Sequence, residues 1–577
     1  MSEADCLPLI ISFGGVNCAG RSSGYHAFRR LVFDRLGEEH QQTTLASLQG
    51  LIASSPGNKP AQGEREFDRQ ALLGGSLVRR LEDDWFTSHG IEPGQLESHA
   101  AGSLPCGFDP GALYTSRNHP RGLQMALFAM NDCLGNLGFD WQQIAALVNP
   151  DKIGVYASSA LGQLDEYALG GLLQSRLDGR RTTTKQIPFS YPQAIADMIN
   201  AYVLGNLGGT SCSLGACAGF LYNLAQAVRD IREGHVQLAV VGVAEAPLVP
   251  ELVEGFTRMS ALASNDKLAA MQGVDQESID FSSACRPFSD NCGFVLAESA
   301  QFLVLAAPHL TMTLGARIFG AVSDVCVNAD GYKQSISSPG VGNYLSVARC
   351  AANLRALLGE ESLQRSVVHA HGTGTPINRS TESEIFSRVA QAFGIRSWPL
   401  TALKGLVGHS QAAAGADQLM LGLGVWANGI IPGITTTNEL GEGVATKGLD
   451  FCLEHREIDP GSLDAMLINA KGFGGNNATA LLLSPQIGES ALRQLFGEKG
   501  HKNWRKRSEI HAANAANYDR NASNGELSFR YLFNHHVLNG TELRISSDRV
   551  GIPGYPDCPL PVQHPLSGLL SGPRTGF

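Results

Sequence analysis

Apolar runs of strand length alternate with helix-length stretches along most of this chain, and this alternation constrains its fold more than any other feature. It occurs twice, first between about Leu9 and Val304 and again between about Ala316 and Leu483. Strands that alternate with helices are typical of α/β proteins, and a repeated order of elements indicates a duplication. The sequence therefore predicts two α/β halves in a duplicated, two-fold arrangement. The expected strands are residues 9–16, 152–157, 237–243, 293–304, 316–322, 367–370, 465–469 and 478–483, and the expected helices are residues 25–36, 123–137, 193–204, 218–233, 344–358, 381–393 and 411–426.

We expect the two halves to span residues 1–308 and 309–484. A polar stretch at about residues 40–112 interrupts the first half, and its composition is typical of an insertion. Residues 485–577 follow the second half and form a C-terminal extension.

The extension has features that the two halves lack. A basic segment, His501 to Arg507, lies in a helical run, and Asn539-Gly540 stands between two β-rich segments. Asn-Gly is a strong hairpin signal, so we expect an α+β tail with a hairpin there. The last residues are rich in Pro and Gly and predict an extended surface strap.

Composition excludes several classes of function. The chain has 44 Lys and Arg against 54 Asp and Glu, and this acidity argues against nucleic acid as the main partner. The 12 cysteines show no paired zinc-type spacing, so no metal site is expected. No stretch is typical of a membrane span or of a signal peptide. We expect a reduced, cytoplasmic protein that makes no use of a membrane.

Cys217 is the first candidate for chemistry. It lies in Gly215-Ala216-Cys217-Ala218-Gly219, directly before an amphipathic helical stretch. A thiol at a helix N-terminus ionises more readily, because the helix dipole and unsatisfied N–H groups favour the thiolate. Taken alone, the pattern is more often that of a small buried core cysteine.

Two histidines follow at glycine-bounded positions in the second half. His371 opens His-Gly-Thr-Gly-Thr-Pro straight after an expected strand, and His409 closes Lys404-Gly-Leu-Val-Gly-His. The glycines allow a sharp turn that would project His371 from the strand end, although an ordinary turn histidine would fit as well. Residues 469–477, Asn-Ala-Lys-Gly-Phe-Gly-Gly-Asn-Asn, add a flexible loop with free backbone N–H groups.

In this order and spacing, these four segments resemble the β-ketoacyl-ACP synthases of the thiolase superfamily. The resemblance covers about residues 9–484 and is weakest in the insertion. It implies a thiolase-like, duplicated αβαβα layered fold and decarboxylative Claisen condensation without a metal or organic cofactor. Counting back from Val243-Ala244-Glu245, the nucleophile of the family falls on Cys217 and not on Cys212.

Several details resemble the narrower FabY-type branch, which starts fatty-acid synthesis from acetyl-CoA. These are Phe13-Gly14-Gly15, the stretch from Asn118 to Met125, the stretch from Arg286 to Phe294, Lys471 to Asn477, and the long tail. The chain departs from common family members at Asn378-Arg379, where they have Gly-Asp, and at Lys471, where an aromatic residue is common. Both departures concern substrate range and gating.

The resemblance implies a role for each catalytic residue. Cys217 is the nucleophile, and His371 and His409 serve decarboxylation and stabilise the enolate. Phe473 is the gate, and its backbone N–H joins that of Cys217 in the oxyanion hole. Lys404 and Glu382 form an organising pair that fixes the histidine loop; the alternative is an ordinary surface pair.

The resemblance also assigns residues to substrate binding, namely Thr373, Thr375, Gly474, Gly475 and Lys471. For Lys471, the sequence leaves open a contact with a CoA phosphate or a structural pair away from it. The implied partners are acyl carrier protein, acyl-CoA and malonyl-ACP, and a second copy of the chain in a homodimer.

Three other functions compete with short-primer condensation. An elongating synthase for longer acyl-ACP shares all the motifs. A degradative thiolase uses a second catalytic cysteine, whereas the matching loops here carry His371 and His409. A non-catalytic subunit that shapes chain length characteristically lacks the nucleophile, and Cys217 is present.

Overall fold

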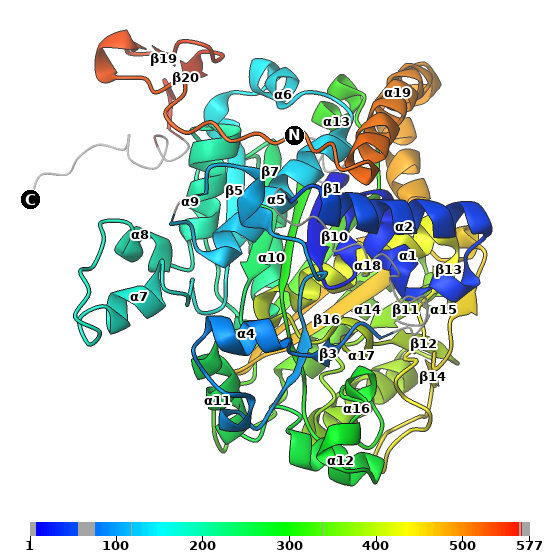
Figure 1. The fold of residues 1–577 in the computed structure, drawn as a ribbon. Helices are drawn as coiled ribbons and strands as arrows, with labels where there is room; N and C mark the ends of the chain where they lie inside the picture. Colours follow the sequence, from blue (N-terminus) through cyan, green and yellow to red (C-terminus); the bar gives the residue numbers. More distant parts are fainter. Residues whose placement is uncertain (1–6, 56–75, 117, 337, 565–566, 568–577) are drawn as a thin grey trace, which may run out of the picture.

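The structure is a computed structural model, and it describes residues 7–55, 76–116, 118–336, 338–564 and 567. A mixed sheet of twelve strands runs through the molecule in the order β14-β12-β11-β16-β17-β10-β1-β9-β7-β5-β6, with β2 paired to β1 (Figure 1). Its strands are β1 (Leu9–Asn17), β2 (Gly20–Arg21), β5 (Ile153–Ser158), β6 (Thr210–Ser211), β7 (Leu238–Glu245), β9 (Ser299–Ala306), β10 (Gly320–Ala329), β11 (Ser366–His369), β12 (Trp398–Thr401), β14 (Leu449–Phe451), β16 (Ala465–Gly472) and β17 (Asn476–Leu483).

The order of pairings confirms the duplication expected from the sequence. In the first half β1, β9 and β7 pair antiparallel in turn, and β7, β5 and β6 then pair parallel. In the second half β10, β17 and β16 pair antiparallel, and β16, β11 and β12 pair parallel. The halves join where β1 meets β10, with Leu9 opposite Ala321.

Helices lie in three layers around this sheet. One outer layer includes α5 (Arg121–Leu137), which packs on β1 and β9, and the other includes α14 (Gly342–Leu358), which packs on β10 and β17. Between the halves lie α10 (Gly219–Arg232) and α18 (Ala414–Asn428), which contact each other and strands of both halves. Every residue of α18 from Ala414 to Trp426 is buried, as a central layer requires. This is the thiolase-like αβαβα arrangement that the sequence predicts.

The strands form because their sequences are nearly continuous apolar runs. All eight residues of β7 are buried, and so are all eight of β9. Strands buried on both faces lack the polar alternation of a surface sheet. The strand expected at residues 293–304 is wrong in extent: a short β8 (Leu296–Ala297) pairs outside the main sheet, and β9 begins only at Ser299.

The described part of the 40–112 stretch packs on the first half. It contains α2 (Glu38–Ala53), which starts just before this stretch, then β3 (Arg79–Arg80), α4 (Asp83–Ser88) and β4 (Ala100–Gly102), which pairs with β8. An apolar cluster joins Phe86 and Leu81 to Phe256 and Phe294 of the first half.

The C-terminal extension begins with the long helix α19 (Pro485–Ser523), whose path changes at Gly497, where φ is +69°. It packs on α2, α5 and α13 (Pro308–Leu314), and Figure 1 shows it in orange at that edge of the molecule. The basic segment from His501 to Arg507 is therefore helical, as expected.

The hairpin expected at Asn539-Gly540 is wrong. Asn539 has a φ of −118°, and its side chain caps a short 3-10 turn, Gly540–Glu542, by accepting from the Thr541 N–H. The hairpin lies further on, between β18 (Arg544–Ile545) and β19 (Arg549–Gly551). Most of the expected strap, residues 568–577, lies outside the described residues. In the described part of the chain, no helix is both long enough and apolar enough to cross a membrane.

Candidate active site

The predicted chemical groups come from four turns, one in the first half and three in the second. Cys217 lies in a 3-10 turn just before α10, and His371 follows β11 directly. His409 follows the short α17 (Lys404–Val407) and precedes α18, while Phe473 lies in the turn between β16 and β17. The duplicated fold therefore brings the nucleophile of one half against the histidines of the other.

These side chains line one pocket of about 670 Å³. The predicted residues that line it are Cys217, His371, Thr373, Thr375, His409, Lys471 and Phe473. Lys404 and Glu382 are buried behind the His371 turn and do not line the pocket. Gly474 and Gly475 form the turn after Phe473 with positive φ values of 90° and 87°, outside the lining.

Cys217 is buried, with 4% of its surface exposed. Burial raises the pKa of its thiol to about 12, while the Lys404 ammonium and the backbone N–H groups of Phe473 and Cys217 act in the opposite direction. The missing side chain of Gly472 lets the backbone before Phe473 lie close to the Cys217 turn. A Cβ at Gly472 would lie 2.2 Å from the Gly215 carbonyl oxygen and 3.0 Å from the Cys217 nitrogen. The Phe473 backbone is thus held against the nucleophile.

The two histidine rings face each other edge to face, with centroids 5.4 Å apart. Burial holds the pKa of both well below its usual value, and the nearby Lys404 ammonium adds to the effect. Both rings are therefore neutral at pH 7.

Hydrogen bonds at Nδ1 fix the tautomer of each histidine. The Gln411 backbone N–H donates to His409 Nδ1 at 3.1 Å, and Lys404 Nζ lies 3.3 Å from His371 Nδ1 and also donates to the His371 carbonyl. A neutral imidazole that accepts at Nδ1 carries its proton on Nε2. Each ring therefore offers an N–H donor on its other side.

Glu382 and Lys404 hold opposite sides of the His371 turn. Glu382 accepts hydrogen bonds from the backbone N–H groups of His371 and Gly372 at 2.7 and 2.8 Å, and from the amides of Asn378 and Asn469 at 2.8 and 2.7 Å. Among the described residues, no ion pair joins it to Lys404. The two are linked through the histidine turn, and their burial excludes the surface-pair alternative.

Lys471 and Asn378, two of the departures from common family members, contact each other. Lys471 Nζ donates to Asn378 Oδ1 at 3.4 Å. Burial lowers the pKa of Lys471, while Glu382 and Asp330 act to raise it. Lys471 therefore has a structural partner and also faces the pocket.

Gln411 is a buried neighbour of the nucleophile that the sequence analysis did not single out. Its Oε1 lies 3.9 Å from Cys217 Sγ, and its backbone φ is +50°. The only signal in the sequence is a large polar residue at the start of a run of small ones.

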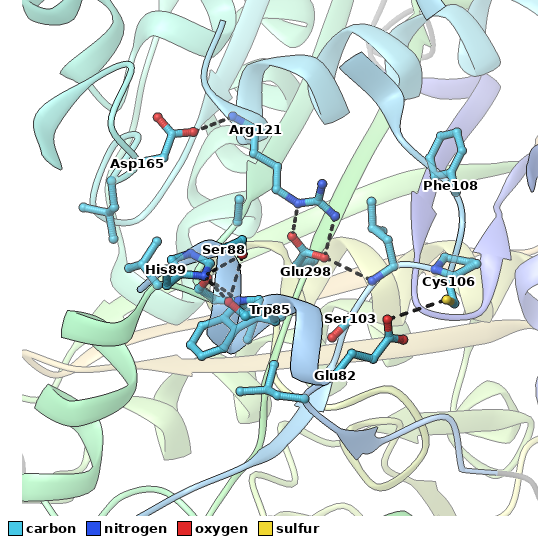
Figure 2. A pocket seen from close by; sticks show the side chains of 18 of the residues that line it. Glu82, Trp85, Ser88, His89, Ser103, Cys106, Phe108, Arg121, Asp165 and Glu298 are labelled. Atoms are coloured by element: carbon cyan, nitrogen blue, oxygen red, sulfur yellow. Dashed lines mark hydrogen bonds and ion pairs between the residues drawn. The ribbon is translucent and has the colours of Figure 1, made fainter. Parts of the chain in front are cut away.

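A second cavity, of about 400 Å³, lies between the insertion and the first half (Figure 2). Arg121 pairs there with Glu298, whose Oε2 lies 3.0 Å from Arg121 Nη2 and 3.1 Å from the Leu104 nitrogen that donates to it. Asp165 accepts from the Arg121 backbone N–H at 2.7 Å. None of the predicted site residues lines this cavity.

Potential metal ligands gather elsewhere. Within the residues that the structure describes, one group has ligating atoms within 4.8 Å of one another: Asp230, Glu233 and His235. None of them lines the Cys217 pocket.

Comparisons with known proteins agree with this geometry. The family models "Beta-ketoacyl synthase, N-terminal domain" and "Beta-ketoacyl synthase, C-terminal domain" match residues 50–309 and 319–438. The chain is 40% identical to the β-ketoacyl-[acyl-carrier-protein] synthase FabY of Pseudomonas aeruginosa, over 95% of this chain and 97% of that protein. It is 26% identical to the 3-oxoacyl-[acyl-carrier-protein] synthase 2 of Staphylococcus aureus, over 63% of this chain and 84% of that protein.

A solved structure shares the fold. The crystal structure of the noncanonical ketosynthase FabY from P. aeruginosa superposes with a TM-score of 0.91 at 38% sequence identity, covering 98% of each chain.

Proposed function

The chain belongs to the β-ketoacyl-ACP synthase family, and from that premise we propose that it condenses a short acyl primer, acetyl-CoA, with malonyl-ACP. One observation carries the proposal: a buried cysteine and two neutral histidines with their donors on Nε2 line a single pocket. A condensing enzyme needs this set, a nucleophile for the primer and neutral donors for an enolate. The FabY-type resemblance supports the short primer.

In the first half-reaction the Cys217 thiolate attacks the thioester carbon of the primer. The backbone N–H groups of Cys217 and Phe473 stabilise the tetrahedral oxyanion. Collapse of this intermediate breaks the bond to the CoA sulfur, which leaves as the thiol with the proton that Cys217 lost. The product is acetyl-Cys217.

In the second half-reaction malonyl-ACP enters and loses its carboxylate as CO₂. The electron pair of the broken C–C bond forms an enolate, whose oxygen accepts from the Nε2–H groups of His371 and His409. The enolate carbon then attacks acetyl-Cys217, and the thiolate leaves. Lys404 stabilises this arrangement from behind, because its ammonium keeps the His371 tautomer fixed and both imidazoles neutral.

The remaining pocket residues suit a pantetheine thioester. The hydroxyls of Thr373 and Thr375 lie 2.9 Å apart and offer polar contacts to the amide arm. Phe473, 36% exposed, guards the approach to Cys217 with its ring stacked near Phe256. Lys471 supplies a cation beside this path, and Gly474 and Gly475 let the Phe473 turn move.

We propose that the enzyme works as a homodimer. Residues 161–214 carry a set of large apolar side chains that are about half exposed or more, and α7 (Leu169–Gln174) and α8 (Gln186–Ser190) of this stretch project from one side of the molecule in Figure 1. The exposed side chains are Leu161, Leu173, Leu177, Ile187, Tyr191, Leu207 and Leu214. Strand β6, at the sheet edge, belongs to the same stretch. Such a surface and an open edge favour association with a second copy. Light scattering at micromolar concentration tests this.

The carrier protein completes the list of partners, and the cytoplasm is the proposed location, since a thiol nucleophile stays reduced there.

Intact-protein mass spectrometry after incubation with acyl-CoA and acyl-ACP primers tests the primer. Acetyl-CoA should add one acetyl group faster than decanoyl-ACP adds a decanoyl group. Loading by decanoyl-ACP with none by acetyl-CoA would make the enzyme an elongating synthase. Thiolysis of ketoacyl-CoA without malonyl-dependent turnover would instead indicate a degradative thiolase.

A further inference from the structure

Gln411 contacts both the nucleophile Cys217 and the histidine His409. Its side-chain Oε1 lies 3.9 Å from Cys217 Sγ, close enough to accept from the thiol. Its backbone N–H donates to His409 Nδ1 at 3.1 Å. The residue is 4% exposed, so water does not compete for these contacts.

The backbone of Gln411 is held in an unfavourable conformation. Its φ of +50° lies in the left-handed region, which non-glycine residues adopt at some cost. Buried acceptors hold the turn, because Glu245 accepts from the next backbone N–H, that of Ala412, and Asp417 accepts from Ser410 Oγ at 2.5 Å. A strained residue that the fold maintains beside a nucleophile points to a function.

Of the two polar atoms in the Gln411 carboxamide, the oxygen has a described hydrogen-bond partner and the nitrogen does not. In the described part of the chain, its Nε2 is buried and has no hydrogen-bond partner. An amide donor buried without a partner carries a free-energy penalty. While Cys217 is a thiol, its S–H donates to Oε1 and the Nε2–H groups stay idle.

Ionisation of Cys217 reverses this situation. A thiolate is an acceptor, so Oε1 would face a second acceptor. A half-turn of the carboxamide exchanges oxygen for nitrogen and lets Nε2–H donate to the sulfur. The idle donor thereby gains a charge-assisted hydrogen bond in the thiolate state.

We infer that Gln411 is a catalytic residue that stabilises the Cys217 thiolate, accepting from the thiol at rest and donating Nε2–H to the thiolate. This deepens the proposed function and rests on it. The step is balanced, because the proton that leaves Cys217 ends on the departing CoA thiol and no electron is gained or lost. The backbone contact to His409 is independent of the side chain, so a substitution isolates the effect on the sulfur.

Other ionisable groups also face Cys217. The Lys404 ammonium favours the thiolate, and the Glu245 carboxyl opposes it. Burial raises the pKa of Glu245 to about 8, and both neighbouring histidines are neutral at pH 7. A substitution of Gln411 leaves all of these groups in place.

Alkylation of Cys217 by iodoacetamide, followed on its tryptic peptide between pH 6 and 10, reports the thiolate directly. Below the pKa of the thiol the alkylation rate follows the thiolate fraction, so in the full-length Gln411→Met variant we expect alkylation to slow about tenfold at each pH from 6 to 10. Acetylation by acetyl-CoA should fall by the same factor. Decarboxylation of malonyl-ACP should change far less, because it depends on the histidines.

Gln411→Asn is the control for backbone strain, since Asn tolerates a positive φ but its shorter amide cannot reach the sulfur. Its alkylation should be slowed as much as that of Gln411→Met, and it serves as the test variant if the Gln411→Met protein does not fold. Wild-type alkylation rates in the folded variants would overturn the role of Gln411. A wild-type protein that no primer acylates would overturn the proposed function, while the alkylation comparison would still report on Gln411.

Discussion

The two cavities of this protein differ in how completely their polar groups are paired. In the cavity beside the insertion, Arg121 is paired with Glu298, and Glu298 and Asp165 also accept from backbone N–H groups. Figure 2 shows the charged groups of Arg121 and Glu298 turned toward each other. In the Cys217 pocket, the described hydrogen bonds of the two histidine rings are at Nδ1. Next to Cys217, the buried side-chain amide of Gln411 has a donor without a described partner.

This difference in pairing indicates that one cavity serves stability and the other serves the reaction. A buried charge whose partners are all present stabilises one conformation and has nothing left to offer a ligand. Buried neutral donors that lack partners are costly in the folded protein, but they are available to charge that develops on a substrate. Substitutions in the cavity beside the insertion should therefore change the free energy of unfolding, and those in the Cys217 pocket should change rates.

The largest effect is expected at Cys217. Cys217→Ala should abolish acyl-enzyme formation, because Cys217 is the one cysteine among the described residues that line the pocket, whereas Cys212→Ala should keep it. Intact-protein mass spectrometry with acetyl-CoA measures both. A stable acyl adduct on the Cys217→Ala protein would remove the nucleophile assignment and with it the contrast between the cavities.

The histidine variants should split the two half-reactions. His371→Ala and His409→Ala each remove an Nε2–H donor to the enolate, and we expect release of CO₂ from malonyl-ACP to fall about 100-fold or more. Acylation of Cys217 should persist in both, since that step uses backbone donors. Trapped ¹⁴CO₂ and the acyl-enzyme mass are the two readouts. Normal decarboxylation in both variants would show that the enolate is stabilised elsewhere.

A substitution in the second cavity should affect stability alone. Glu298→Gln leaves the Arg121 guanidinium without its counter-charge, and because the Arg121 side chain is 40% exposed and partly screened by water, we expect a loss of about 2 kcal/mol in the free energy of unfolding. The rate per folded molecule should be unchanged. Denaturant titration and acetyl transfer measure the two quantities, and the double variant Arg121→Met/Glu298→Leu should recover part of the loss. A selective fall in rate at full stability would give this cavity a role in the reaction.

The pair of Arg121 and Glu298 should make the free energy of unfolding depend on pH. Burial raises the pKa of Glu298, but the Arg121 guanidinium more than offsets this, so the folded value lies below the ordinary one. A lowered carboxyl pKa contributes stability that is complete above the unfolded value of about 4.3 and is lost as the pH falls through the folded value. As the pH falls from about 4.3 through the folded pKa of Glu298, the free energy of unfolding of the wild-type protein should decrease. The decrease should be smaller in Glu298→Gln, and denaturant titration at each pH measures both.

Much of the fold and the centre of the site could be predicted from the sequence. Apolar runs such as Leu238 to Val243 are visible without a structure because both faces of the strand are buried. The histidine and cysteine segments were recognisable only in combination, because their order and spacing resemble those of the β-ketoacyl-ACP synthases. The Asn539-Gly540 hairpin was wrong because the Asn side chain caps a turn of its own.

Other features depend on tertiary contacts and leave no local signal. Gln411 resembles any helix-starting residue until its positive φ and its contact with Cys217 are seen. The link between Lys404 and Glu382 runs through the turn at His371, which spacing alone does not reveal. The second cavity joins residues as distant as Arg121 and Glu298, so no motif marks it.

The smallest effects are expected on α19, where a basic segment combines exposed and paired charges. Lys502, Arg505 and Lys506 are exposed, and Arg505 has only a surface pair with Glu509 at 3.7 Å. Arg507 is exposed too, but it donates to the Thr313 carbonyl at 2.6 Å, near the end of α13. Reversing the charges of Lys502, Arg505 and Lys506 should change the apparent KM for malonyl-ACP less than twofold at low salt, because solvated charges contribute little there. A rise in KM that salt removes would instead show that this helix face docks the acidic carrier protein. Arg507→Met, in contrast, should lower stability by about 1 kcal/mol in a denaturant titration and leave KM unchanged, because it removes hydrogen bonds to a helix C-terminus.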